Sequence, residues 1–191
     1  MSLRELFVCR TFWVLILMML CAGASEQALI QWASAFAEET LHLPKTIGDL
    51  AGPLGFAACM GLSRIIYVKY RDKIHLGDFI KGSCLLCIFS YLLVSLSPLP
   101  SLSLIGCALC GLSVGILWPG TYSKAAASLR NGGTALFAML AFSGDLGCAV
   151  GPASVGMISA LRDGNMRTGI FAAALFPILL LICFLRSRAS E

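Results

Sequence analysis

Residues 133–161 read GTALFAMLAFSGDLGCAVGPASVGMISAL, an apolar run whose single charged side chain is that of Asp145. A helix needs about 20 mostly apolar residues to cross the hydrocarbon core of a bilayer, so this stretch is long enough to span one. A carboxylate inside such a helix is costly and usually serves a function. The stretch therefore predicts both a membrane fold and one functional residue.

The composition of the whole chain agrees with a membrane fold. Of its 191 residues, 58% are hydrophobic and only 13% are charged, whereas soluble domains carry about 25% charged residues. The net charge of +4 comes from loop residues, and no basic cluster is interleaved with aromatic side chains, so we expect no nucleic-acid partner. The chain is predicted to lie in the lipid bilayer.

Five further stretches share the length and apolar character of residues 133–161. They are continuous and lack the alternation typical of strands, which predicts an all-α, polytopic membrane protein. We interpret the first span as retained rather than as a cleaved signal peptide, because further membrane spans follow it instead of a soluble mature domain. We expect one bundle over residues 1–191, with spans at about 12–37, 49–68, 77–97, 102–122, 133–161 and 168–185.

The basic residues predict how the spans are oriented. With the N-terminus inside, the cytoplasmic segments hold ten basic residues and the opposite segments hold only three. This bias predicts an integral protein of the cell membrane with both termini in the cytoplasm. The ten are Arg4, Arg10, Lys69, Arg71, Lys73, Lys81, Lys124, Arg130, Arg186 and Arg188, and the three are Lys45, Arg162 and Arg167.

The second and fifth spans share a short sequence echo. Residues 48–53 read GDLAGP, and residues 144–152 read GDLGCAVGP. The echo predicts that spans one to three and spans four to six are two inverted three-helix repeats, as in many transporters. Glycines four residues apart let membrane helices approach closely. Three such pairs occur, at Gly48/Gly52, Gly111/Gly115 and Gly147/Gly151.

Several motifs resemble those of one transporter family. Residues 61–64 (GLSR) followed by residues 72–73 (DK) resemble the signature loop of the major facilitator superfamily, although a lysine stands where arginine is usual. Residues 115–120 (GILWPG) and 144–152 resemble the tenth and eleventh helices of that superfamily. Residues 24–32 (ASEQALIQW) resemble its seventh helix in the branch of fucose-permease-like sugar symporters.

The resemblance implies the C-terminal six-helix half of a usual twelve-helix fold. Such a chain would carry a small polar solute by alternating access, together with an N-terminal half or a second copy. A truncated, non-transporting remnant or an assembly subunit remains the alternative. A membrane enzyme is disfavoured because His42 and His75 fall in loops and no phosphate-binding loop occurs. We therefore expect no catalytic residue, cofactor or metal.

Polar side chains of the first span predict a substrate site made of Glu26, Gln27, Gln31 and Trp32. A carboxylate and amides exchange hydrogen bonds with solute hydroxyl groups, and an indole offers an apolar platform for a sugar ring. The alternative is a polar stripe that neighbouring helices satisfy within the bundle.

Asp145 is the residue that we predict to couple transport to a proton or a sodium ion. A carboxyl group removed from water binds a proton more readily than one in water, and alternating access would carry that proton across. The alternative is a structural aspartate, for which Arg64 is a conceivable ion-pair partner.

The resemblance also implies a conformational latch formed by Arg64, Asp72 and Lys73 at the cytoplasmic end. The plainer interpretation is that these residues anchor the helix end at the membrane surface. Trp118 and Tyr122 end the fourth span, and we interpret them as interfacial anchors rather than as ligands.

Overall fold

The computed structural model describes residues 3–70 and 75–188, and these residues form helices joined by short connections, without a strand. Six helical segments within them are long and apolar enough to cross a membrane, which confirms the predicted all-α fold class. The six segments are Arg10–Thr40, Lys45–Tyr70, Leu76–Leu96, Pro100–Ser128, Gly133–Ala160 and Met166–Ser187.

Most of these segments extend beyond the apolar stretches from which they are predicted. The second begins at Lys45 instead of residue 49, and the fourth continues to Ser128 instead of ending at residue 122. Charged and polar side chains at the ends reach toward the membrane surface, so the backbone can continue its helical hydrogen bonds past the apolar core.

Four of the six spans are assembled from more than one helix. The elements are α1 (Leu3–Val8), α2 (Arg10–Ile30), α3 (Ala33–Ala35), η1 (Phe36–Thr40), α4 (Lys45–Asp49), η2 (Leu50–Leu54), α5 (Gly55–Tyr70), α6 (Leu76–Leu96), α7 (Pro100–Val114), α8 (Leu117–Ser128), α9 (Gly133–Ala160), α10 (Met166–Ala173) and α11 (Leu175–Arg188). Pro119 lies just after the break between α7 and α8, whereas α9 is continuous through Pro152.

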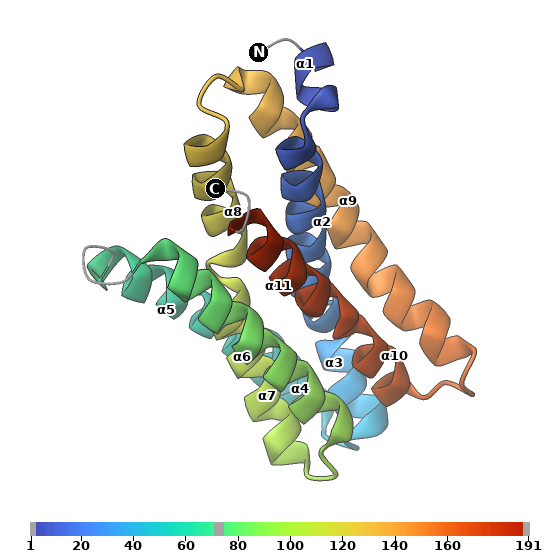
Figure 1. Ribbon diagram of the computed structural model, residues 1–191. Helices are drawn as coiled ribbons and strands as arrows, with labels where there is room; N and C mark the ends of the chain where they lie inside the picture. The colour runs from blue at the N-terminus through green and yellow to red at the C-terminus, as the bar shows by residue number, and fades with distance from the viewer. Residues whose placement is uncertain (1–2, 71–74, 189–191) are drawn as a thin grey trace.

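The first three spans and the last three spans pack across one another. Figure 1 shows α2 running alongside α9, while α5, α6 and α7 group on the other side of the molecule. The first span packs against the fifth and sixth spans, through α9 and α11, and the fourth span packs against the second and third spans, through α5 and α6. The leading span of each predicted three-helix unit therefore packs against the other two spans of the opposite unit.

Glycines make the closest of these helix contacts possible. In α9, a Cβ atom on Gly147 would collide with the carbonyl oxygen of Leu20, and one on Gly151 would lie 2.6 Å from the carbonyl oxygen of Ala24. In α7, a Cβ atom on Gly111 would collide with the backbone of Phe56 in α5. These contacts confirm that the glycine spacing serves close packing of the α2–α9 and α5–α7 pairs.

Hydrogen bonds from buried side chains add cross-links between the spans. The Tyr91 hydroxyl group in α6 donates to the Ser25 carbonyl oxygen in α2 at 2.8 Å. The Ser143 hydroxyl group in α9 donates to the Ile16 carbonyl oxygen in α2, also at 2.8 Å. Tyr91 is fully buried, and an unpaired hydroxyl group at such a site would be costly. Both bonds therefore help to fix α2 as the central helix of the bundle.

Candidate functional site

An open hollow of about 500 Å³ lies where the first, second, fourth and fifth spans meet. Its lining combines two charged side chains with aromatic and small apolar ones. The lining residues are Glu26 of α2, Arg64 of α5, Trp118, Pro119 and Tyr122 of α8, and Cys148 of α9. Solute sites of secondary transporters lie where membrane helices meet, and a hollow that contains charged side chains at such a place is a candidate solute site.

Arg64 is held in place by the backbone carbonyl oxygen of Gly115, which has no donor within its own helix. Its Nε–H donates to the carbonyl oxygen of Gly115 at 3.1 Å. In a regular helix that carbonyl oxygen would accept from the N–H of residue 119, but Pro119 has no N–H. The break between α7 and α8 therefore leaves a free acceptor. The Arg64 guanidinium group donates to this acceptor and also lines the hollow.

Glu26 brings the opposite charge to the same hollow. The carboxylate is partly buried and within electrostatic range of Arg64. No ion pair joins the two side chains in the part of the chain that the structure describes. Two opposite charges that share a hollow without pairing directly leave room for a polar solute or water between them, and either would lower the cost of holding both charges inside a membrane.

Trp118 and Tyr122 line the hollow, which their interpretation as interfacial anchors does not predict. Their ring centroids lie 6.4 Å apart. The Trp118 indole rests on Gly144, where a Cβ atom would lie 2.9 Å from ring carbon Cζ2. Its Nε1–H is buried and has no hydrogen-bond partner among the described residues. The signal in the sequence is the GILWPG motif, because its glycine and proline turn the helix and direct Trp118 inward.

Asp145 lies beside this hollow but is not part of its lining. The residue is exposed near the middle of α9 and is within electrostatic range of Tyr122 and Cys148. It forms no ion pair with Arg64 among the described residues. An exposed carboxylate at this depth is costly to leave against lipid tails, so it requires a water-filled path or a covering protein surface.

The other predicted substrate residues do not line the hollow. Gln27 is partly buried beside Glu26, and Gln31 is exposed at the end of α2. Trp32 follows at the break before α3, and its Nε1–H donates to the Pro152 carbonyl oxygen at 3.0 Å. Its ring packs against α9 at Gly156. Trp32 thus connects the two halves of the first span to the fifth span.

Replacing Trp32 by phenylalanine should destabilise the fold by about 1 kcal/mol, because the Pro152 carbonyl oxygen loses its indole donor while the ring packing is largely kept. The measurement is thermal unfolding of the purified protein in detergent. Trp13→Phe is the control, because the Trp13 side chain is half exposed and its indole bonds only the nearby Phe7 carbonyl oxygen. An equal effect of both substitutions would contradict the bridging role of Trp32.

The predicted latch is only partly described. Asp72 and Lys73 lie outside the described residues. Arg64 lies six residues before the end of α5 at Tyr70, about 9 Å along the helix axis. Its bond to Gly115 and its place in the hollow connect it to the fourth span.

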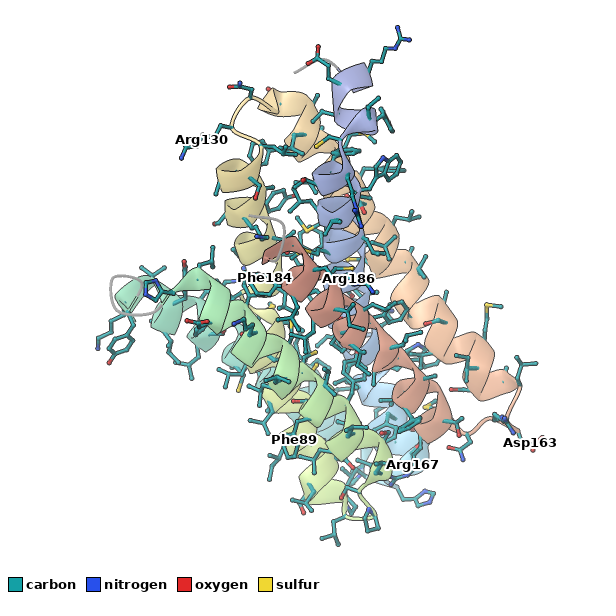
Figure 2. All side chains as sticks on the ribbon, in the orientation of Figure 1. Phe89, Arg130, Asp163, Arg167, Phe184 and Arg186 are labelled. Atoms are coloured by element: carbon teal, nitrogen blue, oxygen red, sulfur yellow. The ribbon has the colours of Figure 1, made fainter. Side chains whose placement is uncertain are left out.

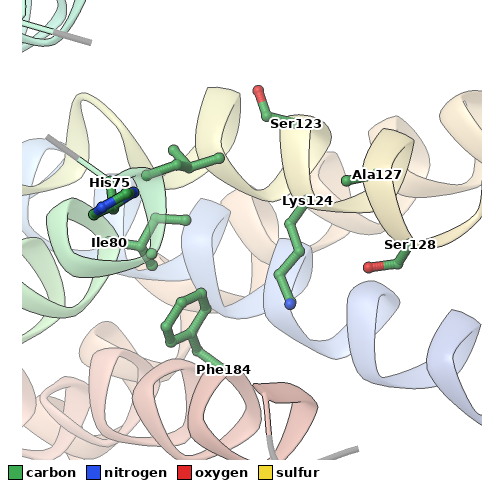
Figure 3. Close-up of a pocket in the computed structure, with 9 residues that line it drawn as sticks. His75, Ile80, Ser123, Lys124, Ala127, Ser128 and Phe184 are labelled. Carbon is green, nitrogen blue, oxygen red and sulfur yellow. The ribbon is translucent and has the colours of Figure 1, made fainter. Parts of the chain in front are cut away.

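A second, smaller cavity of about 310 Å³ lies near the helix ends, between the start of α6, the end of α8 and α11. Figure 3 shows the Lys124 side chain extending toward the ring of Phe184, and the ammonium nitrogen lies 5.6 Å from the ring centroid. Ile80 of α6 and His75, the residue just before α6, also line the cavity. A cation over an aromatic face is attracted to it, so this contact helps to hold α8 against α11.

The described residues hold no group of three or more His, Cys, Asp or Glu side chains that is able to bind a metal ion. The buried cysteines of α6 and α7 instead pack against one another, and Cys87 lies within hydrogen-bonding range of Cys110. Small thiols of this kind fill space in an apolar core.

Comparison with known proteins places the chain in a family. A search of curated proteins found no match. A comparison with protein-family models matches residues 1–152 to the Major Facilitator Superfamily, a range that includes the first four spans and most of the fifth. The match covers well over half of the chain and agrees with the six apolar helices. The protein therefore belongs to the major facilitator superfamily, whose members are integral membrane proteins that carry small solutes across the lipid bilayer by secondary transport.

Proposed function

We propose that this chain forms the C-terminal half of a secondary transporter for a small polar solute, a sugar or a similar polyol, that works by alternating access. The observation that carries the proposal is the open hollow that Glu26, Arg64 and Trp118 line. The two charged groups offer an acceptor and a donor to hydroxyl groups, and the indole face offers an apolar platform for a ring. Gln27 lies beside Glu26 on the first span, whereas Trp32 packs against α9 outside the hollow.

The hollow is open on one side, so a further helical unit is needed to close it. The low burial of two of the spans supports this requirement. The second and fifth spans are the least buried of the six spans that the described residues form. They carry the exposed carboxylate of Asp145 and exposed apolar side chains such as Leu54 and Phe142. A second six-helix unit, either an N-terminal half or a second copy of this chain, would cover these faces and close the solute path.

The test of the proposal uses Trp118 as a reporter of solute binding. Trp13→Phe and Trp32→Phe together leave Trp118 as the single tryptophan of the protein. L-fucose and D-galactose are titrated against the purified protein in lipid nanodiscs while tryptophan emission is followed. We expect a saturable change for a sugar that binds. Binding without uptake by proteoliposomes that contain the chain alone would indicate a missing second half, and neither binding nor uptake would favour the non-transporting remnant or assembly subunit.

The coupling role of Asp145 is tested by replacing it with asparagine. We expect Asp145→Asn to abolish accumulation driven by a proton or sodium gradient, because an amide cannot take up and release the ion. Exchange of labelled for unlabelled sugar at equal concentrations should persist, because exchange needs no net ion movement. Both are measured in proteoliposomes that hold the complete transporter.

The matched control is Asp163→Asn, which makes the same change in the connection between α9 and α10. Undiminished gradient-driven accumulation in Asp145→Asn would remove Asp145 from the coupling mechanism and leave it a structural residue.

A further inference from the structure

A groove of about 540 Å³ opens between α2 and α11, away from the solute hollow. The two helices pack against each other, and Figure 1 shows that they run in opposite directions, with the start of α2 and the end of α11 toward the same end of the bundle. Two arginines line the groove, Arg10 in the first turn of α2 and Arg186 in the last turn of α11. Figure 2 shows Arg186 on α11 where that helix passes over α2.

Among the residues that the structure describes, the two guanidinium groups have no anionic partner. Both side chains are exposed, and neither forms a hydrogen bond or an ion pair within residues 3–70 and 75–188. Two cations that line one groove repel each other, and an anion between them would remove that repulsion. Guanidinium groups also match the geometry of phosphate oxygens, to which they donate paired hydrogen bonds.

Below the arginines the groove is apolar. Val14 and Leu17 follow Arg10 by four and seven residues, which places the three side chains along one face of α2. Cys183 lies one turn before Arg186 and lines the groove from α11. Leu17 remains 41% exposed although it lies at least 10 Å along the helix from Arg10, by the usual rise per residue. A soluble anion would leave this apolar floor uncovered.

The aromatic side chains beside Arg10 place it at the surface of the membrane. The rings of Phe7, Phe12 and Trp13 form a cluster with centroids 5.5 to 5.6 Å apart. The Trp13 indole N–H donates to the Phe7 carbonyl oxygen at 2.8 Å. Tryptophan is enriched at the level of the lipid headgroups. The arginines therefore lie at headgroup depth, and the apolar floor extends toward the acyl chains.

We propose that this groove binds one anionic phospholipid, such as phosphatidylglycerol. The phosphate group lies between Arg10 and Arg186, and one acyl chain follows Val14, Leu17 and Cys183 along the seam of α2 and α11. Basic pockets between membrane helices bind anionic headgroups in this way. The lipid would fasten the first span to the sixth span at one end of the bundle, and its site is separate from the hollow that holds the solute.

Lipid retention in nanodiscs tests the proposal. The protein is placed in phosphatidylcholine that contains a minor fraction of phosphatidylglycerol, and the lipids that remain bound are counted by native mass spectrometry. Arg10→Gln and Arg186→Gln should each weaken phosphatidylglycerol binding about fivefold, which corresponds to the usual contribution of one basic residue near an anionic headgroup. Arg162→Gln is the matched control. Arg162 is also exposed, but it lies in the connection between α9 and α10 and does not line the groove.

A third substitution separates a specific site from general attraction to a charged surface. Leu17→Trp keeps both arginines but fills the apolar floor, so it should also displace the bound lipid. Unchanged binding in Leu17→Trp, or an equal loss in Arg162→Gln, would overturn the proposal. Soluble glycerol 3-phosphate should not raise the melting temperature of the protein. A rise equal to that caused by phosphatidylglycerol would instead assign the arginines to a soluble phosphate compound.

Discussion

Replacing Glu26 by glutamine is expected to weaken solute binding by about ten- to a hundredfold, the range for losing one hydrogen bond to a charged group. Glu26 supplies the only carboxylate among the residues that line the hollow. Its substitution removes a charged acceptor for solute hydroxyl groups and leaves the Arg64 guanidinium group without an opposite charge. The measurement is the Trp118 emission titration with the sugar that binds the unchanged protein.

The control for this substitution is Glu38→Gln. Glu38 lies on the same span, in η1, but is exposed and lies outside the hollow. The same neutralisation there should leave the binding constant unchanged. If Glu26→Gln binds the sugar as tightly as the unchanged protein does, the hollow is not the solute site, and Glu26 only balances the charge of Arg64.

The second large effect is expected from Gly147→Val. A Cβ atom at this position collides with the carbonyl oxygen of Leu20 in α2, and backbone atoms cannot move aside as a flexible side chain can. The valine must push α9 away from α2 and thereby separate the most extensive helix pair of the bundle. We expect a destabilisation of about 3 kcal/mol. Thermal unfolding in detergent and the fraction of monodisperse protein measure it.

Gly61→Val is the matched control in α5. A Cβ atom on Gly61 has no neighbour within 4 Å, so valine has free space there. Valine also favours a helix slightly more than glycine does. The control should therefore unfold at or slightly above the temperature of the unchanged protein. Equal melting temperatures for the two variants would show that the α2–α9 contact does not limit stability.

The two aspartates of the sequence echo differ in their surroundings. Asp49 ends α4 and accepts a hydrogen bond from the Ser34 hydroxyl group, which connects α4 of the second span to the first span. Asp145 lies exposed near the middle of α9, beside the hollow. The glycines of both copies, in contrast, serve close helix contacts, since Gly52 faces Ala33 and Gly144 lies between Gly23 and Trp118. The shared motif therefore reflects shared packing, and each carboxylate has its own environment.

The sequence alone was sufficient for the membrane fold, the six spans and the close glycine contacts. The reason is that each depends on local properties: apolar length is set by the thickness of the bilayer, and glycine spacing is set by the pitch of one helix. The motifs of residues 61–64, 115–120 and 144–152 also sufficed to point to the family to which the chain belongs. The polar side chains of the first span made Glu26 a candidate substrate residue, and residues 61–64 made Arg64 a candidate latch residue.

Only the tertiary structure decided which of these side chains meet. Arg64 bonds a carbonyl group 51 residues away, and Trp32 bonds one that is 120 residues away. Trp118, expected at the membrane surface, lines the hollow, while Trp32, expected at the substrate, packs against α9. These outcomes depend on how far each helix rotates about its axis and where it crosses its neighbours. Because these helices carry apolar side chains on almost every face, their sequence indicates that rotation only weakly. The close glycine contacts and the helix breaks near prolines determine it.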